Sequence, residues 1–193
     1  MNKVATQYKI LNESNTDGIM LVWPEKHMNS DFSIELEINY AHIINLLIHH
    51  EIKTYIVASE NNDSSVLTNI RKKNNNNMLK ILNYECDDIW IRDYGQNTVY
   101  KNDVEDRILV DWIYNRNRPY DDLVPEHIAA YFNADMYITT QSPYNLMGTG
   151  GNFMSDGMGT GFSSKLILDE NSGGYAWNGP SGNVFYPNHT LSE

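Results

Sequence analysis

The sequence predicts an α/β fold, because short strand-like hydrophobic segments alternate with longer segments of helical periodicity. The segment GIMLVWP, residues 18–24, has the composition of a buried strand that ends at a proline. Apolar residues at helical spacing from Ile34 to Glu51 predict a helix, and KTYIVAS, residues 53–59, is rich in β-branched and aromatic residues typical of a strand. Together these three segments predict one βαβ unit.

The next segments continue the alternation. SSVLTNIRKK predicts a second, short helix, with Ser64 or Ser65 as the N-cap. Four consecutive asparagines, residues 74–77, predict a surface loop, and NMLKIL, which ends at residue 82, predicts another strand. The chain therefore reaches its central motif directly after a strand.

Beyond the central motif, the pattern predicts two more strands and a helix. RILVDWIY, from Arg107 to Tyr114, and MYITT, residues 136–140, predict strands. Between them PEHIAAYFNA predicts a helix, with Pro125 placed for its first turn. After residue 145 the chain becomes glycine-rich, which indicates turns or the lip of a site where the backbone approaches a ligand. These glycines lack the lysine and the spacing of a phosphate-binding loop.

Composition and charge restrict the function. The chain has 193 residues, 14 of them Lys or Arg, and a formal net charge of −11. A nucleic-acid or anionic-membrane surface is therefore not expected, and a cationic ligand is favoured. The single cysteine, Cys86, excludes an internal disulfide and a CxxC metal site. With no signal-peptide pattern and no run of 18 apolar residues, we expect a cytoplasmic protein, although secretion stays open.

The central motif DDIWIRDYGQN, residues 87–97, places charged groups around a tryptophan. If this segment is extended, Asp93 shares one face with two isoleucines, and Trp90 lies on the opposite face. A carboxylate beside apolar side chains needs a cation or hydrogen-bond donors. One interpretation is an internal pair between Arg92 and an aspartate. The other is that Trp90 and Asp93 line a pocket for a planar cation such as a guanidinium.

WIRDYG, followed by TGGNFMSDGMGTGFSS and then DEN, resembles the bacterial, Porphyromonas-type peptidylarginine deiminases and the agmatine deiminases. VWP near the start and NHTLSE at the end are similar to further motifs of this family. The resemblance implies a partial pentein, a pseudo-fivefold α/β propeller of ββαβ modules. Residues 1–193 would form the N-terminal portion of one catalytic domain, roughly its first two to three modules, with a first module at about 17–100 and the following, incomplete modules at about 101–193.

The resemblance also implies a reaction. In the family a late cysteine attacks the guanidinium carbon, ammonia leaves, and water hydrolyses the thiouronium intermediate, while a histidine acts as general acid and base. None of the six histidines has Asp two residues later, and Cys86 precedes WIRDYG, so we interpret Cys86 as a packing residue. We therefore expect a substrate-binding half that is inactive alone. It would need no cofactor or metal and would pair with the missing half or with itself.

The same resemblance assigns site residues. Asp93 would bind the guanidinium as the catalytic carboxylate, with Trp90 as an apolar wall. Asn152 and Asp156 would order the channel around the guanidinium. For Asp156 an equally good interpretation is a turn residue before Gly157.

The substrate depends on NRNRP, residues 115–119. If the segment is extended, Arg116 and Arg118 point the same way and can clamp a carboxylate; alternatively they are a solvated surface pair. In the peptidylarginine branch such a pair contacts the carboxylate of a C-terminal arginine, and the agmatine branch tends to have Glu where this chain has Thr149. We therefore expect conversion of peptidyl or C-terminal arginine to citrulline. The alternatives are an agmatine deiminase of putrescine synthesis and a non-catalytic guanidino-binding fragment.

Overall fold

The structure is a computed structural model that describes residues 18–26, 28, 34–73, 77–100, 107–141, 145–155 and 161–171. The described residues fall into two compact units, and the boundary between the units lies between Ile91 and Arg92. The module boundary near residue 100 stays a prediction, because a compact unit is not the same as a repeating module. No helix within these described ranges is long and apolar enough to cross a membrane.

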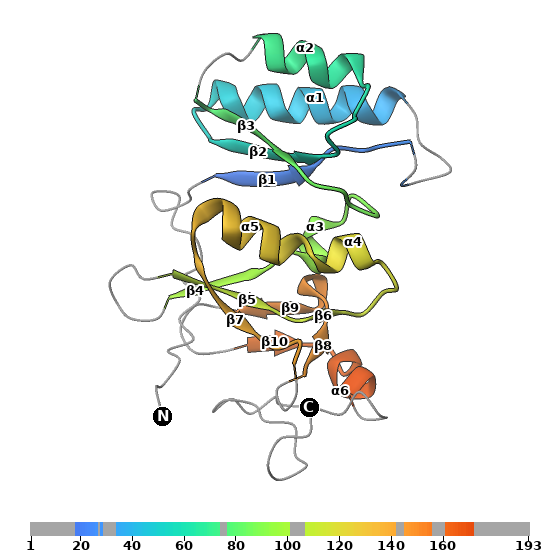
Figure 1. The fold of residues 1–193 in the computed structure, drawn as a ribbon, viewed down its shortest axis with the longest axis vertical. Coiled ribbons are helices and arrows are strands. Elements are labelled where there is room, and N and C mark those ends of the chain that lie inside the picture. Colours follow the sequence, from blue (N-terminus) through green and yellow to red (C-terminus); the bar gives the residue numbers. More distant parts are fainter. Residues whose placement is uncertain are drawn as a thin grey trace. The chain divides into compact units, whose positions relative to one another are not determined.

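The first unit is a three-stranded parallel sheet with two helices. Its elements are β1 (Ile19–Val22), α1 (Ile34–His49), β2 (Thr54–Ala58), α2 (Ser65–Lys73) and β3 (Leu79–Asn83). The strand order is β1-β2-β3, and both pairings are parallel. Figure 1 shows α1 and α2 side by side over one face of this sheet. The predicted βαβ unit is present and is extended by a second helix and strand.

The core of the first unit follows from the hydrophobic pattern. Trp23, Ile44 and Ile56 are fully buried, and Leu67 and Ile70 of α2 join the same cluster. Strand β2 is buried at four of its five positions, and its residues Ile56 and Ala58 belong to the same cluster.

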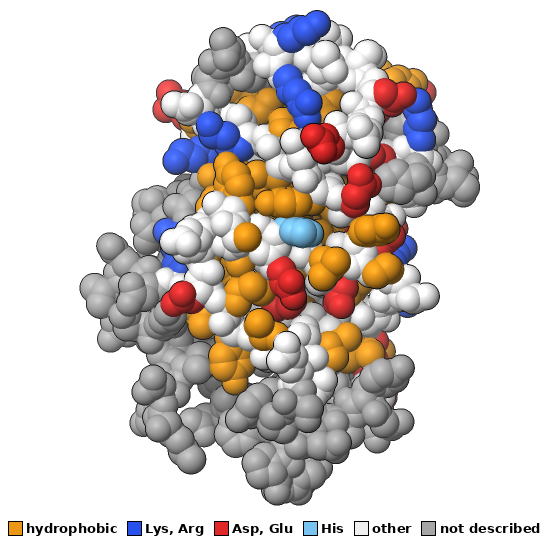
Figure 2. Space-filling model, viewed as in Figure 1, with side chains coloured by type: hydrophobic (Ala, Val, Ile, Leu, Met, Phe, Trp, Pro, Cys, Tyr) orange, Lys and Arg blue, Asp and Glu red, His pale blue; other side chains and the backbone are white. Residues whose placement is uncertain are grey.

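The start of α2 confirms one of the two predicted caps. The hydroxyl of Ser64 accepts a hydrogen bond from the backbone N–H of Leu67 at 3.1 Å, which is the geometry of an N-cap residue. At the other end of the helix, Arg71, Lys72 and Lys73 are exposed in the last turn, where positive charge complements the helix dipole. Figure 2 shows Lys and Arg side chains in blue on the part of the surface where α2 lies.

The second unit is built from short strands and short helices. Its elements are α3 (Ile91–Tyr94, which begins one residue before the boundary), β4 (Asn97–Tyr100), β5 (Arg107–Asp111), β6 (Ile113–Tyr114), α4 (Pro119–Asp122), α5 (Val124–Phe132), β7 (Asp135–Ile138), β8 (Met147–Gly148), the 3-10 turn η2 (Gly150–Asn152), β9 (Phe153–Ser155), β10 (Gly161–Ser163) and α6 (Leu166–Asn171). Strands β4, β5 and β7 form one sheet, β6 pairs with β8, and β9 pairs with β10.

The predicted strand from Arg107 to Tyr114 is wrong in one respect, because it is two strands that meet at Trp112. Strand β5 pairs in parallel with β7, whereas β6 pairs in parallel with β8. The carbonyl of Asp111 accepts hydrogen bonds from both the backbone N–H and the hydroxyl of Thr139. One residue past Trp112, the N–H of Ile113 donates to Leu146. The chain thus changes its pairing partner at this point.

Helix α5 covers the β4-β5-β7 sheet and matches its prediction. Pro125 lies in the first turn, and the helix ends at Asn133, whose left-handed backbone (φ 50°) lets its N–H donate to the last carbonyls. Ile128 and Ala129 are buried beneath the helix, while Tyr131 and Phe132 are partly exposed. Figure 2 shows hydrophobic side chains gathered over this part of the unit.

Candidate functional site

The short helix α3 covers Ile91–Tyr94 of the WIRDYG motif, so the extended conformation considered for this segment is not present. The backbone groups before the turn are satisfied locally, because the carboxylate of Asp88 accepts the N–H of Ile89 and the carbonyl of Ile89 accepts the N–H of Ile91. Tyr94 is 1% exposed and packs edge-on against Tyr114, with ring centroids 5.7 Å apart. The aromatic contact anchors the helical turn and leaves Asp93 half-buried beside it.

The second motif packs directly against the first. A Cβ atom at Gly150 would overlap the backbone carbonyl oxygen of Arg92, and a Cβ atom at Gly151 would overlap a carboxylate oxygen of Asp93. Glycine is therefore required for space at Gly150, where the neighbour is backbone, whereas a side chain at Gly151 would have to displace the Asp93 carboxylate. The structure thus brings TGGN and WIRDYG, which lie far apart in the sequence, into contact.

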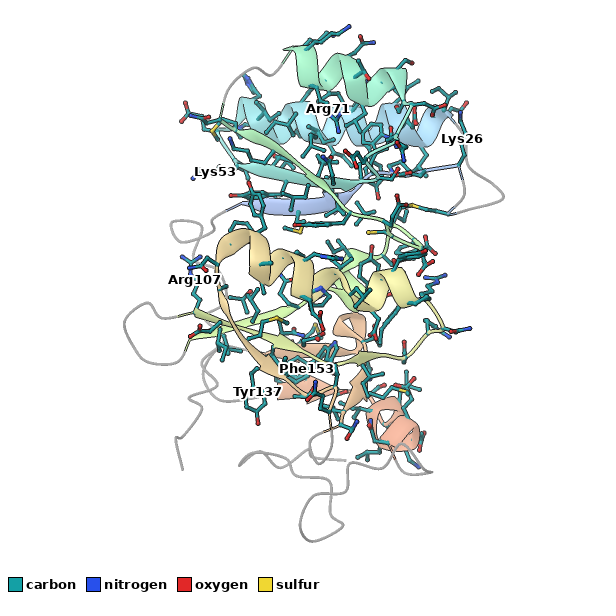
Figure 3. All side chains as sticks on the ribbon, viewed as in Figure 1. Lys26, Lys53, Arg71, Arg107, Tyr137 and Phe153 are labelled. Carbon is teal, nitrogen blue, oxygen red and sulfur yellow. The ribbon has the colours of Figure 1, made fainter. Side chains whose placement is uncertain are left out.

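The Arg92 side chain reinforces this contact. Its guanidinium Nη2 donates to the backbone carbonyl of Phe153 at 3.0 Å, at the start of β9. Figure 3 labels Phe153 among the strands of the second unit, where its ring meets that of Trp112 at 5.8 Å. Among the residues that the structure describes, the Arg92 guanidinium donates to a carbonyl, which does not support its interpretation as half of an internal pair with aspartate. Arg92 instead ties α3 to the strand that follows η2.

Three charged groups surround the buried hydroxyl of Tyr114. Burial raises the pKa of Tyr114 above its usual value, Arg118 opposes this by charge and by a hydrogen bond to the hydroxyl, and the charges of Asp93 and Asp121 add to the increase. Tyr114 is 6% exposed and Asp121 is fully buried. Asp93 and Arg118 therefore both act electrostatically on the same hydroxyl group.

The arginine pair does not have the geometry of an extended segment. Residues 115–117 bend, and the N–H of Arg118 donates to the carbonyl of Arg116 at 2.9 Å, which closes a tight turn. Arg118 is half-buried and hydrogen-bonded to the Tyr114 hydroxyl, whereas Arg116 is exposed. The prediction that an extended backbone aims both side chains the same way is therefore wrong, and Arg118 is the member held near Asp93.

The bend that carries the arginines is fastened at both ends. The N–H of Tyr114 donates to the carboxylate of Asp122 at 2.7 Å, and the amide of Asn115 donates to Glu170 of α6 at 2.6 Å. In the same helix the side chain of Asn171, which is 1% exposed, exchanges hydrogen bonds with the backbone of Met147. Helix α6, which contains the DEN motif, therefore holds both β8 and the arginine segment.

Asn152 fixes the glycine turn to the adjacent hairpin. Its amide nitrogen donates to the hydroxyl of Ser163 at 3.1 Å, and its amide oxygen accepts from the N–H and the hydroxyl of Ser164. These bonds use the Asn152 amide within the protein, which favours a positioning role. The predicted role of Asp156 falls outside the described residues.

Trp90 and Cys86 belong to the first unit. Trp90 is 56% exposed, so its ring is accessible, and its role as a wall for the guanidinium stays a prediction. Cys86 is 2% exposed, which agrees with its interpretation as a packing residue. Within the described ranges no group of three or more His, Cys, Asp or Glu side chains is arranged to hold a metal ion.

Asp111 is a buried carboxylate at the end of β5. It is 2% exposed, and its Oδ1 atom has no hydrogen-bond partner. Burial raises the pKa of Asp111 to about 7, the nearby charges of Asp122 and Glu126 contribute to the increase, and a hydrogen bond from the backbone of Trp112 opposes it. This group therefore titrates near neutral pH, in the unit that holds Asp93.

The sequence did not point to three residues of this region. Tyr114 looked like an ordinary strand residue, Gly151 like a turn glycine, and Glu170 was only part of the short DEN motif. Their partners, Arg118, Asp93 and Asn115, are distant or depend on a bend, so periodicity gives no signal for them.

Comparison with known proteins identifies the family. The model of the Porphyromonas-type peptidyl-arginine deiminases matches residues 11–173. The chain belongs to this family. A Mycoplasma capricolum protein that carries the name agmatine deiminase is 25% identical over an alignment of 167 residues, and the match covers 80% of this chain and 43% of that protein.

Solved structures of this deiminase family confirm the fold. The agmatine deiminase of Enterococcus faecalis matches with a TM-score of 0.61 and 23% identity, over 77% of this chain and 41% of that one. The agmatine deiminase of C. jejuni matches with a TM-score of 0.60 and 22% identity, over 80% of this chain and 44% of that one. The chain has part of the pentein fold, and it spans less than half the length of these relatives.

Proposed function

We propose that this chain provides the guanidinium-binding part of an arginine deiminase-type hydrolase, with Asp93 as the carboxylate that pairs with the guanidinium. The observation that carries the proposal is the placement of Asp93, which is half-buried against Gly151 and close to the Tyr114 hydroxyl. A fixed carboxylate can accept two parallel N–H hydrogen bonds from a guanidinium, and burial strengthens them. The resemblance of WIRDYG and TGGN to the deiminases supports the same role.

In the complete reaction a cysteine thiolate forms a bond to the guanidinium carbon, and the carbon–nitrogen bond to the leaving ammonia breaks after that nitrogen is protonated. Water then displaces the thiolate and leaves a ureido product. A histidine that donates and later accepts a proton is needed for both steps. Asp93 would hold the guanidinium so that its carbon faces the thiolate, while Cys86 is buried and is not proposed as the nucleophile.

We propose arginine with a free carboxylate, as in a peptide that ends in arginine, as the first substrate candidate. Arg118 lies near Asp93 through Tyr114, so its positive charge would attract a carboxylate of the bound substrate. A second candidate is agmatine, because the Arg118 guanidinium is already hydrogen-bonded to Tyr114 and Arg116 is exposed. The names of the relatives also favour this second candidate.

Calorimetry with the 193-residue chain tests the role of Asp93. We expect a peptide ending in arginine to bind, and Asp93→Asn to weaken binding about tenfold or more, because hydrogen bonds to a charged partner contribute about 1.5–3 kcal/mol. Asp63→Asn is the matched control, since Asp63 is 82% exposed and lies in the first unit. An Asp93→Asn affinity within threefold of the parent would refute the assignment, and a parent chain that binds neither the peptide nor agmatine would refute the proposed function.

A further inference from the structure

The two glycines of η2 differ in what a side chain would meet. Neither glycine has a positive φ angle, so backbone conformation does not explain them. A Cβ at Gly150 would meet the rigid backbone of Arg92, whereas a Cβ at Gly151 would meet the end of the Asp93 side chain, with Cγ at 3.3 Å. A substitution at Gly151 therefore acts on a movable group, the carboxylate itself.

The glycine turn cannot easily move away from Asp93. The N–H of Asn152 donates to the carbonyl of Thr149 at 2.9 Å within the turn, and the Asn152 side chain is bonded to Ser163 and Ser164. The Arg92 guanidinium holds the neighbouring carbonyl of Phe153. Because the turn is fixed from several directions, an added methyl group would displace the Asp93 carboxylate more readily than the backbone.

We propose that Gly151 is a positioning residue for Asp93. Because position 151 has no side chain, the Asp93 carboxylate can occupy the space beside it in the orientation used to bind a guanidinium. The inference rests on the proposed function of Asp93. It adds that affinity for guanidino compounds depends on a residue that itself makes no charged contact. The Tyr114 hydroxyl and Arg118 lie near the same carboxylate, so a displaced Asp93 would also lose its place relative to Arg118.

Three glycine-to-alanine variants separate positioning from general packing. Gly151→Ala is the test, and Gly148→Ala is the matched control, because the nearest atoms to a Cβ at Gly148 are those of the Trp112 ring at 3.4–3.8 Å, an ordinary contact distance. Gly150→Ala shows how much stability is lost when the new side chain clashes with backbone, because its Cβ would overlap the Arg92 carbonyl. We expect Gly150→Ala to lower the free energy of unfolding most. Gly148→Ala should resemble the parent.

Two measurements on the full chain test the inference. Calorimetry with agmatine and with a peptide ending in arginine should show at least tenfold weaker binding for Gly151→Ala. Side-chain NMR couplings of Asp93 should show a changed χ1 rotamer in Gly151→Ala and an unchanged one in Gly148→Ala. The rotamer needs no ligand, so it still tests the inference if the parent binds neither compound, a result that would refute the proposed function instead.

The opposite results are equally specific. An Asp93 rotamer that is the same in Gly151→Ala and in the parent would overturn the inference, whatever happens to stability. So would an unchanged affinity of Gly151→Ala for a guanidino compound that the parent binds. In an Asp93→Ala background, Gly151→Ala should cost less stability than it does in the parent, because the overlapping carboxylate is gone; an equal cost would place the clash elsewhere.

Discussion

The pKa of Asp111 makes a quantitative prediction about the stability of the second unit. Burial raises this pKa from 3.8 to about 7. Between these two values the folded protein keeps a proton on Asp111 that the unfolded chain has lost, so the free energy of unfolding falls as the pH rises. The difference of about three pKa units corresponds to roughly 4 kcal/mol. The contribution of the protonated Asp111 to the free energy of unfolding is fully present below about pH 4, and it is lost above about pH 7.

Asp111→Asn removes this titration and keeps the shape of the side chain. The amide oxygen can take the place of the carboxylate oxygen that accepts the backbone N–H of Trp112, while the amide nitrogen takes the place of Oδ1, which has no hydrogen-bond partner. Relative to the variant, we expect the parent to lose about 1.4 kcal/mol of unfolding free energy per pH unit between pH 4 and pH 7. The variant should therefore be the more stable protein at pH 8.

Urea denaturation at one-unit intervals from pH 4.5 to pH 8.5 measures this difference, and the 13C chemical shift of the Asp111 carboxyl group reports its midpoint directly. The control is Asp63→Asn, because Asp63 is 82% exposed and its pair with Lys26, at 3.6 Å, is a surface ion pair worth at most about 1 kcal/mol. Parallel stability curves for the parent and Asp111→Asn, or a carboxyl midpoint near 4, would refute the reasoning.

Three further predictions concern binding, chemistry and helix stability. Replacing Arg116 and Arg118 with alanine should weaken a peptide ending in arginine about tenfold or more relative to agmatine, as measured by the ratio of their dissociation constants; an unchanged ratio would exclude the clamp. The 193-residue chain should release no citrulline or ammonia from arginine compounds, and a signal abolished by Cys86→Ala would contradict this. Ser64→Ala should cost about 1 kcal/mol of unfolding free energy, because the N-cap bond to Leu67 is lost, whereas Ser65→Ala should be nearly neutral.

Local pattern was sufficient to predict the first unit. Its strands and helices follow hydrophobic periodicity, and Ser64 was one of two predicted caps for α2. Parallel strands joined by helices bury apolar residues regularly, so a sequence window contains most of the information. The family resemblance of WIRDYG and TGGN was likewise sufficient to predict the fold, which the solved structures confirm.

The errors lie where hydrogen bonds between distant segments decide the backbone. The strand predicted across Trp112 is interrupted because Asp111 and Ile113 bond to different partners, Thr139 and Leu146. The expected extended form of the arginine segment fails because Asn115 is bound to Glu170 of α6, 55 residues away. No window of local sequence contains such partners.

The charges around Asp93 provide a physical reason to separate the two substrate candidates. Agmatine carries a guanidinium and an ammonium group, both positive at neutral pH, whereas a C-terminal arginine carries a guanidinium and a carboxylate. When Asp93 holds the guanidinium, the second charge of the ligand is left to interact with Arg118, which is held near Asp93 by Tyr114. For two unit charges about 8 Å apart, Coulomb's law gives about 0.5 kcal/mol in water and about 2 kcal/mol at an effective dielectric constant of 20.

That interaction is repulsive for agmatine and attractive for a carboxylate, so the difference between the two ligands is about twice the single term. Asp121, which is fully buried near the same hydroxyl, offsets part of the Arg118 charge and reduces the difference without changing its sign. On the proposed function, we therefore expect Arg118 to favour the carboxylate-bearing ligand even if its guanidinium never leaves Tyr114 to contact the substrate. A preference for the peptide that persists in Arg116→Ala, and is lost in Arg118→Ala, would assign specificity to this single charge and not to a two-arginine clamp.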